Sequence, residues 1–152
     1  MPNRRDFVIS AVGLMLAGLS AERLTARAPE PITVYKSKTC GCCAKWVEYL
    51  QASGFAPLVH DEESMDAIKD RLGVPGDLRS CHTALAGKYL IEGHVPAREI
   101  RKLLAERPKV TGLAVPGMPS GTPGMAQSQA DEGNFTVLAF QRDGSSYPFA
   151  RY

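Results

Sequence analysis

The residues most able to do chemistry in this chain of 152 residues are its four cysteines, three of which lie within four positions, Cys40-Gly41-Cys42-Cys43. The fourth is Cys81. Cys40 and Cys43 have the C-x-x-C spacing of redox-active thiols. An even cysteine count in an exported chain would first suggest two structural disulfides. The clustering argues against that interpretation, because cross-links that close such short loops constrain the unfolded chain least.

The extra thiol of Cys42 favours a metal site over a simple dithiol. A dithiol catalyst does not need Cys42, and adjacent cysteines rarely form a disulfide with each other because its geometry is strained. A helix N-terminus stabilises thiolates, which are soft ligands that select Cu(I), zinc or iron–sulfur clusters. A structural zinc site would more often show two separated C-x-x-C pairs, which this sequence lacks. Neighbouring Cys42 and Cys43 also favour bridging several metal ions.

One histidine and two methionines extend the set of candidate metal ligands. His82 follows Cys81 directly and is a candidate ligand or proton donor, with a structural hydrogen bond as the alternative. Met118 and Met125 each follow a glycine in a loop-like stretch. Their thioethers favour Cu(I), since thioether is a poor zinc ligand. Their alternative role is packing, for which methionine is well suited.

The other two histidines, His60 and His94, are interpreted as structural residues. His94 precedes a predicted helix, and we interpret it as a turn or capping residue. His60 ends a predicted strand before the acidic run 61–63, which we expect to form the solvated start of a helix.

The elements that must position these side chains are predicted in the order β-α-β-α-β-β-α. Runs of apolar and β-branched residues predict strands, the last two joined by a Gly-Lys turn, at 32–35, 56–60, 83–86 and 89–92. Helical spacing with glycine or proline stops predicts helices over about 43–53, 65–72 and 96–107. This order predicts an α/β, thioredoxin-like fold, a mixed sheet with flanking helices. In that fold, the loop before the hairpin brings Cys81 beside the cysteine cluster, and His82 stands where a cis-proline is expected.

The domain prediction is a thioredoxin-like, copper-binding domain over 31–108 followed by an extension over 109–152 that packs on the same domain. Residues 112–124 have the glycine and proline content of a loop. Residues 135–140 and 147–152, separated by an Asp-Gly turn, predict a C-terminal hairpin.

Residues 1–28 have the parts of an export signal, with Arg4-Arg5 ahead of an apolar run over 7–19 and small residues after it. The arginine pair resembles a twin-arginine signal; an ordinary secretory signal or an uncleaved anchor is the alternative. Cleavage after Ala28 removes four arginines and two acidic residues, so the formal charge falls from +2 to 0. We therefore expect a periplasmic protein with no stable membrane span after cleavage. Nucleic-acid binding has no support, because the sequence has no run of Lys and Arg with interleaved aromatic residues.

Several separated motifs occur in a fixed order over about residues 31–125, namely Thr39-Cys40-Gly41-Cys42-Cys43, Gly73-Val74-Pro75, Ser80-Cys81-His82-Thr83, Ile91-Glu92-Gly93-His94-Val95-Pro96 and Gly112–Pro119. Together they resemble a bacterial thioredoxin-like, metal-binding family formerly labelled as a domain of unknown function, to which a copper-resistance protein belongs. The resemblance implies a thioredoxin-like fold, a periplasmic location and copper held as a bridged cluster. The matching ligand positions are Cys40, Cys42, Cys43 and Cys81.

The sequence therefore predicts a periplasmic protein of copper resistance or homeostasis that holds Cu(I) in a multinuclear thiolate site. The expected partners are copper ions and a periplasmic copper efflux or oxidase protein. Copper redox activity with the thiols as electron source is a variant of this prediction. The alternatives are a thiol–disulfide oxidoreductase that acts on proteins and a structural zinc module.

Overall fold

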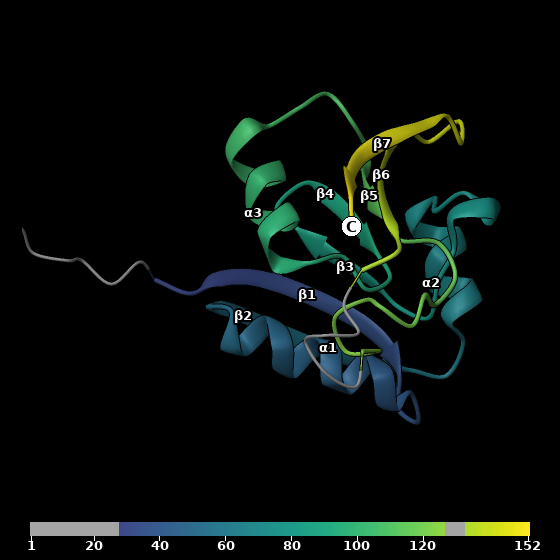
Figure 1. Cartoon of the computed structure of the whole chain (residues 1–152). Coiled ribbons are helices and arrows are strands. Elements are labelled where there is room, and N and C mark those ends of the chain that lie inside the picture. Colours follow the sequence, from purple (N-terminus) through teal and green to yellow (C-terminus); the bar gives the residue numbers. More distant parts are fainter. Residues whose placement is uncertain (1–27, 127–132) are drawn as a thin grey trace, which may run out of the picture.

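The computed structural model describes residues 28–126 and 133–152, in which seven strands form one mixed sheet flanked by three α-helices (Figure 1). The strands are β1 (Glu30–Ser37), β2 (Phe55–Glu62), β3 (Thr83–Ala86), β4 (Tyr89–Glu92), β5 (Gly112–Ala114), β6 (Thr136–Phe140) and β7 (Ser146–Arg151). The helices are α1 (Gly41–Ala52), α2 (Met65–Leu72) and α3 (Ala97–Glu106), with a 3₁₀ turn η1 (Gly76–Leu78). The predicted α/β class with a mixed sheet is confirmed.

The order of the strands is β2-β1-β3-β4-β5-β6-β7. β1 and β2 are parallel and joined through α1, as parallel neighbours require a crossover connection. β3 is antiparallel to both β1 and β4, and its hairpin with β4 has the predicted bounds. Gly87 opens the two-residue turn of this hairpin with φ 57°, a conformation that glycine adopts at little cost. The start of α1 and the loop before β3 therefore meet at the same end of the sheet.

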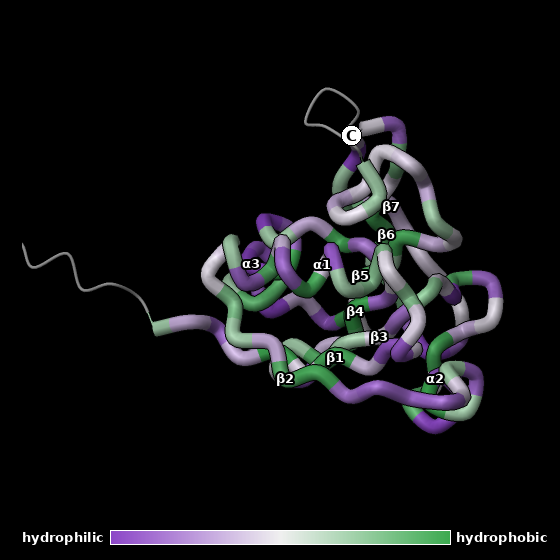
Figure 2. Tube along the Cα trace, turned by 90° about the horizontal axis from the view of Figure 1, so that it is seen from below, coloured by the Kyte–Doolittle hydropathy of each residue, from purple (hydrophilic) through white to green (hydrophobic). Residues whose placement is uncertain are grey.

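Side chains of the central strands alternate between two hydrophobic clusters. Ile91 and Leu113 face the cluster that α1 and α3 cover, while Leu90 and Ala114 face a smaller cluster near α2 and η1. Figure 2 shows the hydrophobic stretches gathered in these central strands and a hydrophilic stretch between β2 and α2. Burial on both faces explains why the central strands read as nearly continuous apolar runs.

Strand β5 corrects the expectation of a loop over 112–124. Gly112–Ala114 is buried, parallel to β4 and antiparallel to β6. Gly112 fits there because a Cβ at its position would strike the backbone of Leu90. The glycine that suggested a loop is thus required by the close approach of two strands.

The acidic run after His60 is also placed differently from the prediction. Asp61 and Glu62 end β2, and Asp61 accepts a hydrogen bond from Lys36 at 2.7 Å across the strand pair. Helix α2 starts later, because the side chain of Ser64 caps it by accepting from the backbone N–H of Ala67. His60 is exposed and stacks on the ring of Tyr35.

The C-terminal hairpin is formed by β6 and β7, close to the predicted bounds, and it continues the same sheet beyond β5. The predicted export signal lies outside the described residues apart from Ala28. Among the residues that the structure describes, no helix has the length and hydropathy to cross a bilayer.

Candidate metal centre

The start of α1 holds three of the four sulfur atoms. Cys40 is the N-cap residue, and its carbonyl oxygen accepts the backbone N–H of Ala44 at 3.2 Å. Cys40 and Cys43 form a disulfide, and Cys43 is fully buried against the core. Cys42 keeps a free thiol, 3.5 Å from the sulfur of Cys40. The C-x-x-C pair is therefore present in its oxidised state.

Cys81 reaches this cluster from the loop between η1 and β3. The four cysteine sulfur atoms all lie within 4.8 Å of one another. The loop is held on its other side by Gly117, whose N–H donates to the carbonyl of Arg79 at 3.2 Å and whose carbonyl accepts from the hydroxyl of Ser80. Sulfur atoms 41 residues apart in sequence thus share one site because the fold sets two loops side by side.

Two histidines contact the thiol of Cys81. Its sulfur lies 3.3 Å from Nδ1 of His82 and 3.1 Å from Nε2 of His94. The other ring nitrogen of His94, Nδ1, lies 2.7 Å from the carbonyl oxygen of Pro123. Because a carbonyl only accepts, that nitrogen carries the hydrogen, and Nε2 presents a lone pair towards Cys81. Cys81, His82 and His94 form a second compact donor group that shares Cys81 with the cysteine cluster.

His94 is the site residue that sequence reasoning missed. It does not cap α3, whose N-cap is Pro96 with no side-chain capping bond. The signal that could have found it is the hairpin register. Since Thr83 pairs with Glu92, the same register carried two residues further sets Cys81 opposite His94.

His82 is fully buried and packs between the rings of Trp46 and His94. Its ring centroid lies 4.3 Å from that of Trp46 and 4.9 Å from that of His94. Trp46 is fixed in turn by donating from its indole nitrogen to the carbonyl of Val95 at 3.0 Å. Nε2 of His82 is buried and has no hydrogen-bond partner in the described structure. The ring nitrogen that faces Cys81, and that would meet a metal bound there, is the other one, Nδ1.

The loop after β5 closes over the start of α1, as Figure 1 shows. A Cβ on Gly124 would lie 2.8 Å from the backbone nitrogen of Trp46, and its φ of +84° favours glycine. This loop carries both predicted methionine ligands. Met118 is 57% exposed and follows Gly117, while Met125 is partly buried and follows Gly124. Whether the thioethers bind metal stays a prediction.

Burial sets the protonation of the donors. Burial first, and the nearby Cys42 second, raise the pKa of Cys81 to about 12. Burial first, then the neighbouring His94 and Lys69, hold the pKa of His82 well below its ordinary 6.5. Burial also lowers the pKa of His94. At neutral pH the metal-free site therefore holds a Cys81 thiol and two neutral imidazoles, so a metal that binds Cys81 must release its proton.

These donors fit a soft metal ion. Thiolate and neutral imidazole suit Cu(I), whereas oxygen donors suit harder cations. The disulfide occupies two of the four sulfur atoms, so the oxidised protein offers the thiols of Cys42 and Cys81 beside the imidazoles. Four thiols become available only after that bond is reduced.

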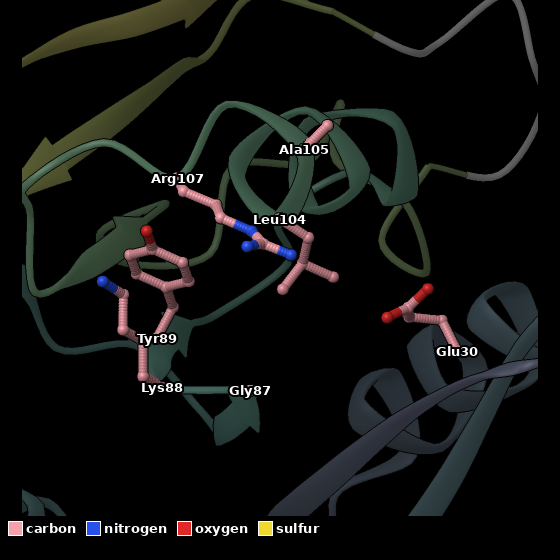
Figure 3. A pocket seen from close by; sticks show the side chains of 7 residues that line it. All are labelled: Glu30, Gly87, Lys88, Tyr89, Leu104, Ala105 and Arg107. Atoms are coloured by element: carbon pink, nitrogen blue, oxygen red, sulfur yellow. The ribbon is translucent and has the colours of Figure 1, made fainter.

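A pocket at the far end of the sheet contains none of these donors (Figure 3). It is lined by Glu30, Gly87, Lys88, Tyr89, Leu104, Ala105 and Arg107. The turn that contributes Gly87 and Lys88 follows β3, whereas Cys81 precedes that strand. This pocket is therefore separate from the cysteine site.

Comparison with known proteins gives three findings. The family described as "Protein of unknown function, DUF411" matches residues 78–125. No curated protein matches the chain. Two solved structures, "Copper resistance protein copG- Form 1" and "Form 2", are each 43% identical with a TM-score of 0.74, covering 82% of this chain and 98% of their own.

We predict that the metal-free protein loses stability as the pH falls below 6.5. The pKa of His82 lies well below 6.5 in the folded protein and returns to 6.5 on unfolding. Below that pH the unfolded chain binds a proton that the folded chain does not, so stability present above pH 6.5 is lost as the pH falls. Thermal unfolding at pH 7.5 and 5.5 measures the loss.

His82→Gln is expected to reduce this pH dependence, whereas His60→Gln, at an exposed position of β2, serves as the matched control. A His82→Gln protein with the full wild-type pH dependence would contradict the assignment.

Proposed function

This chain belongs to the family of copper resistance protein CopG and carries the DUF411 signature, and from that premise we propose that it binds copper as a periplasmic protein of copper resistance or homeostasis. The observation that carries the proposal is the group of four cysteine sulfur atoms within 4.8 Å of one another. The softness of the donors supports Cu(I) as the bound ion. The export features of residues 1–28 support the location.

The proposed binding state is the reduced one. Reduction of the Cys40–Cys43 bond takes two electrons and two protons and yields two thiols. Loss of the thiol protons would then leave four negative sulfur atoms that repel one another. Cu(I) ions remove that repulsion, and the adjacent Cys42 and Cys43 favour sulfur atoms that bridge two ions. We therefore propose a multinuclear Cu(I)–thiolate site, with Cys81 and His82 completing it.

The same cysteine pair supports a copper redox activity. Two Cu(II) ions can each accept one electron from the reduced pair, which releases its two thiol protons to solvent and becomes the Cys40–Cys43 disulfide as two Cu(I) ions form. The free thiols of Cys42 and Cys81 remain as ligands for the product. We propose that the protein then passes Cu(I) to a periplasmic copper efflux or oxidase protein.

A thiol–disulfide oxidoreductase is the second candidate, favoured by the oxidised C-x-x-C pair at a helix N-terminus. A thioredoxin-like core over 31–108 is part of our proposal, supported by the strand order β2-β1-β3-β4. Two features weigh against protein disulfide exchange. Cys42 and Cys81 add thiols that a dithiol catalyst does not need, and His82 precedes β3 where a proline is expected.

We predict that mature protein, reduced and loaded without oxygen, retains more than one Cu(I) per chain. Cys40→Ser and Cys81→Ser should each lose most of this copper, because each removes a soft ligand from the shared site. His60→Gln should retain it. Metal analysis after desalting gives the copper count. A metal-free protein that efficiently reduces protein disulfides and ignores added Cu(I) would instead establish the oxidoreductase.

We predict that the double variant Met118→Leu/Met125→Leu holds Cu(I) about tenfold more weakly than wild type, which corresponds to about 1.4 kcal/mol. Leucine preserves the volume of methionine, so the variant removes the thioethers while keeping their packing. Competition with a Cu(I) chelator measures the change, and Met65→Leu on α2 is the control. Unchanged affinity would assign both methionines to packing alone.

A further inference from the structure

A buried ion pair lies behind the loop that carries Cys81. Nζ of Lys69, from α2, lies 2.5 Å from Oε1 of Glu92, at the end of β4. The side chains are 3% and 0% exposed, so both charges are removed from water. Thr83 links them, because its hydroxyl accepts from Lys69 at 2.9 Å and donates to Oε2 of Glu92 at 2.6 Å. The proposed copper chemistry uses none of these three side chains.

The carboxylate of Glu92 also holds the Cys81 loop directly. Its Oε1 accepts the backbone N–H of Ser80, the residue before Cys81, at 2.7 Å. The backbone around Glu92 ties the other side of the site, since the N–H of Gly93 donates to the carbonyl of His82 at 3.0 Å. His94 follows one residue later. Glu92 is thus joined to the segments that carry Cys81, His82 and His94.

Stability alone is a weak reason for this arrangement. Removing two charges from water is unfavourable, and apolar residues of similar volume often replace such a pair with no loss of stability. What apolar side chains cannot reproduce is the acceptor oxygen, Oε1 of Glu92, that fixes the backbone N–H of Ser80 in the loop. The geometry therefore favours a positioning role over a stabilising one.

We propose that Glu92, held by Lys69 and Thr83, is a positioning residue that fixes the Ser80 amide and so keeps the sulfur of Cys81 within 4.8 Å of the other cysteine sulfur atoms. Only the predicted change in Cu(I) affinity rests on the proposed copper function. The placement of Cys81 itself can be measured without metal.

The test replaces the network with apolar side chains in Lys69→Met/Glu92→Leu. In the metal-free, disulfide-bonded protein, alkylation of Cys81 should become several-fold faster while alkylation of Cys42 stays unchanged, as read by peptide mass spectrometry. In the reduced protein, Cu(I) affinity should fall by about tenfold or more, the range seen when groups that orient metal ligands are removed. Glu92→Gln keeps one acceptor oxygen for the Ser80 N–H. This variant should therefore have nearly wild-type Cys81 alkylation and Cu(I) affinity.

Glu99→Leu is the matched control, because Glu99 is an equally buried carboxylate on α3 whose partners are Arg98 and Tyr152. It should leave Cys81 alkylation unchanged. A folded Lys69→Met/Glu92→Leu protein with wild-type Cys81 alkylation would overturn the positioning role. A wild type that binds no copper would instead overturn the proposed function, while the alkylation data would still report on Glu92.

Hydrogen exchange of the wild-type Ser80 amide tests the same contact without any variant. The amide lies in a loop, yet its exchange rate should be within about tenfold of that of the Ile91 amide in β4. Both amides are expected to become exposed to water only when the core opens. Exchange at the rate of an open loop amide would overturn the inference.

Discussion

The register of the β3–β4 hairpin determines where the soft donors meet. Thr83 pairs with Glu92, and the chain on either side of that pair carries Cys81 and His94 to a sulfur–nitrogen distance of 3.1 Å. A slip of one residue would turn these side chains to the other face of the sheet. β1 and α1 bring the remaining cysteines to the same end of the sheet. Glu92, the partner of Lys69 in the buried ion pair, is the last residue of β4 in the hairpin. The distances between these donor atoms therefore depend on the register of the hairpin.

Electrostatic repulsion between sulfur atoms limits the negative charge that the site can hold. Four thiolates within 4.8 Å cannot persist together unless positive charge is added or charge is removed. The disulfide removes two of them, and burial keeps Cys81 protonated by raising its pKa to about 12. Cu(I) would achieve the same neutralisation with all four sulfur atoms as ligands. Disulfide formation and the proposed copper binding by all four cysteines would therefore compete for the same sulfur atoms.

Local sequence signals predicted much of this arrangement, and long-range contacts account for what they missed. The Gly-Lys turn and its flanking apolar runs predicted the hairpin, and the cysteine spacing predicted the cluster at a helix start. His94 was missed because its neighbours in sequence form a turn, whereas its partner lies across the hairpin. Lys69 gave no signal of burial because it sits in a short, polar helix, and only the tertiary contact with Glu92 keeps it there. Gly112 suggested a loop because the contact that requires a glycine there, with the backbone of Leu90 in the neighbouring strand, is also tertiary.

The most direct test of this account is the copper content of one wild-type preparation divided in two, one part with Cys40–Cys43 reduced and the other with it intact. Both are loaded with Cu(I) without oxygen, desalted and analysed for copper per chain. Binding by all four sulfur atoms predicts more than one tightly held Cu(I) in the reduced protein and a clearly lower content in the disulfide form, which has two fewer thiols. Equal copper contents would contradict it, because the binding site could not then include Cys40 and Cys43.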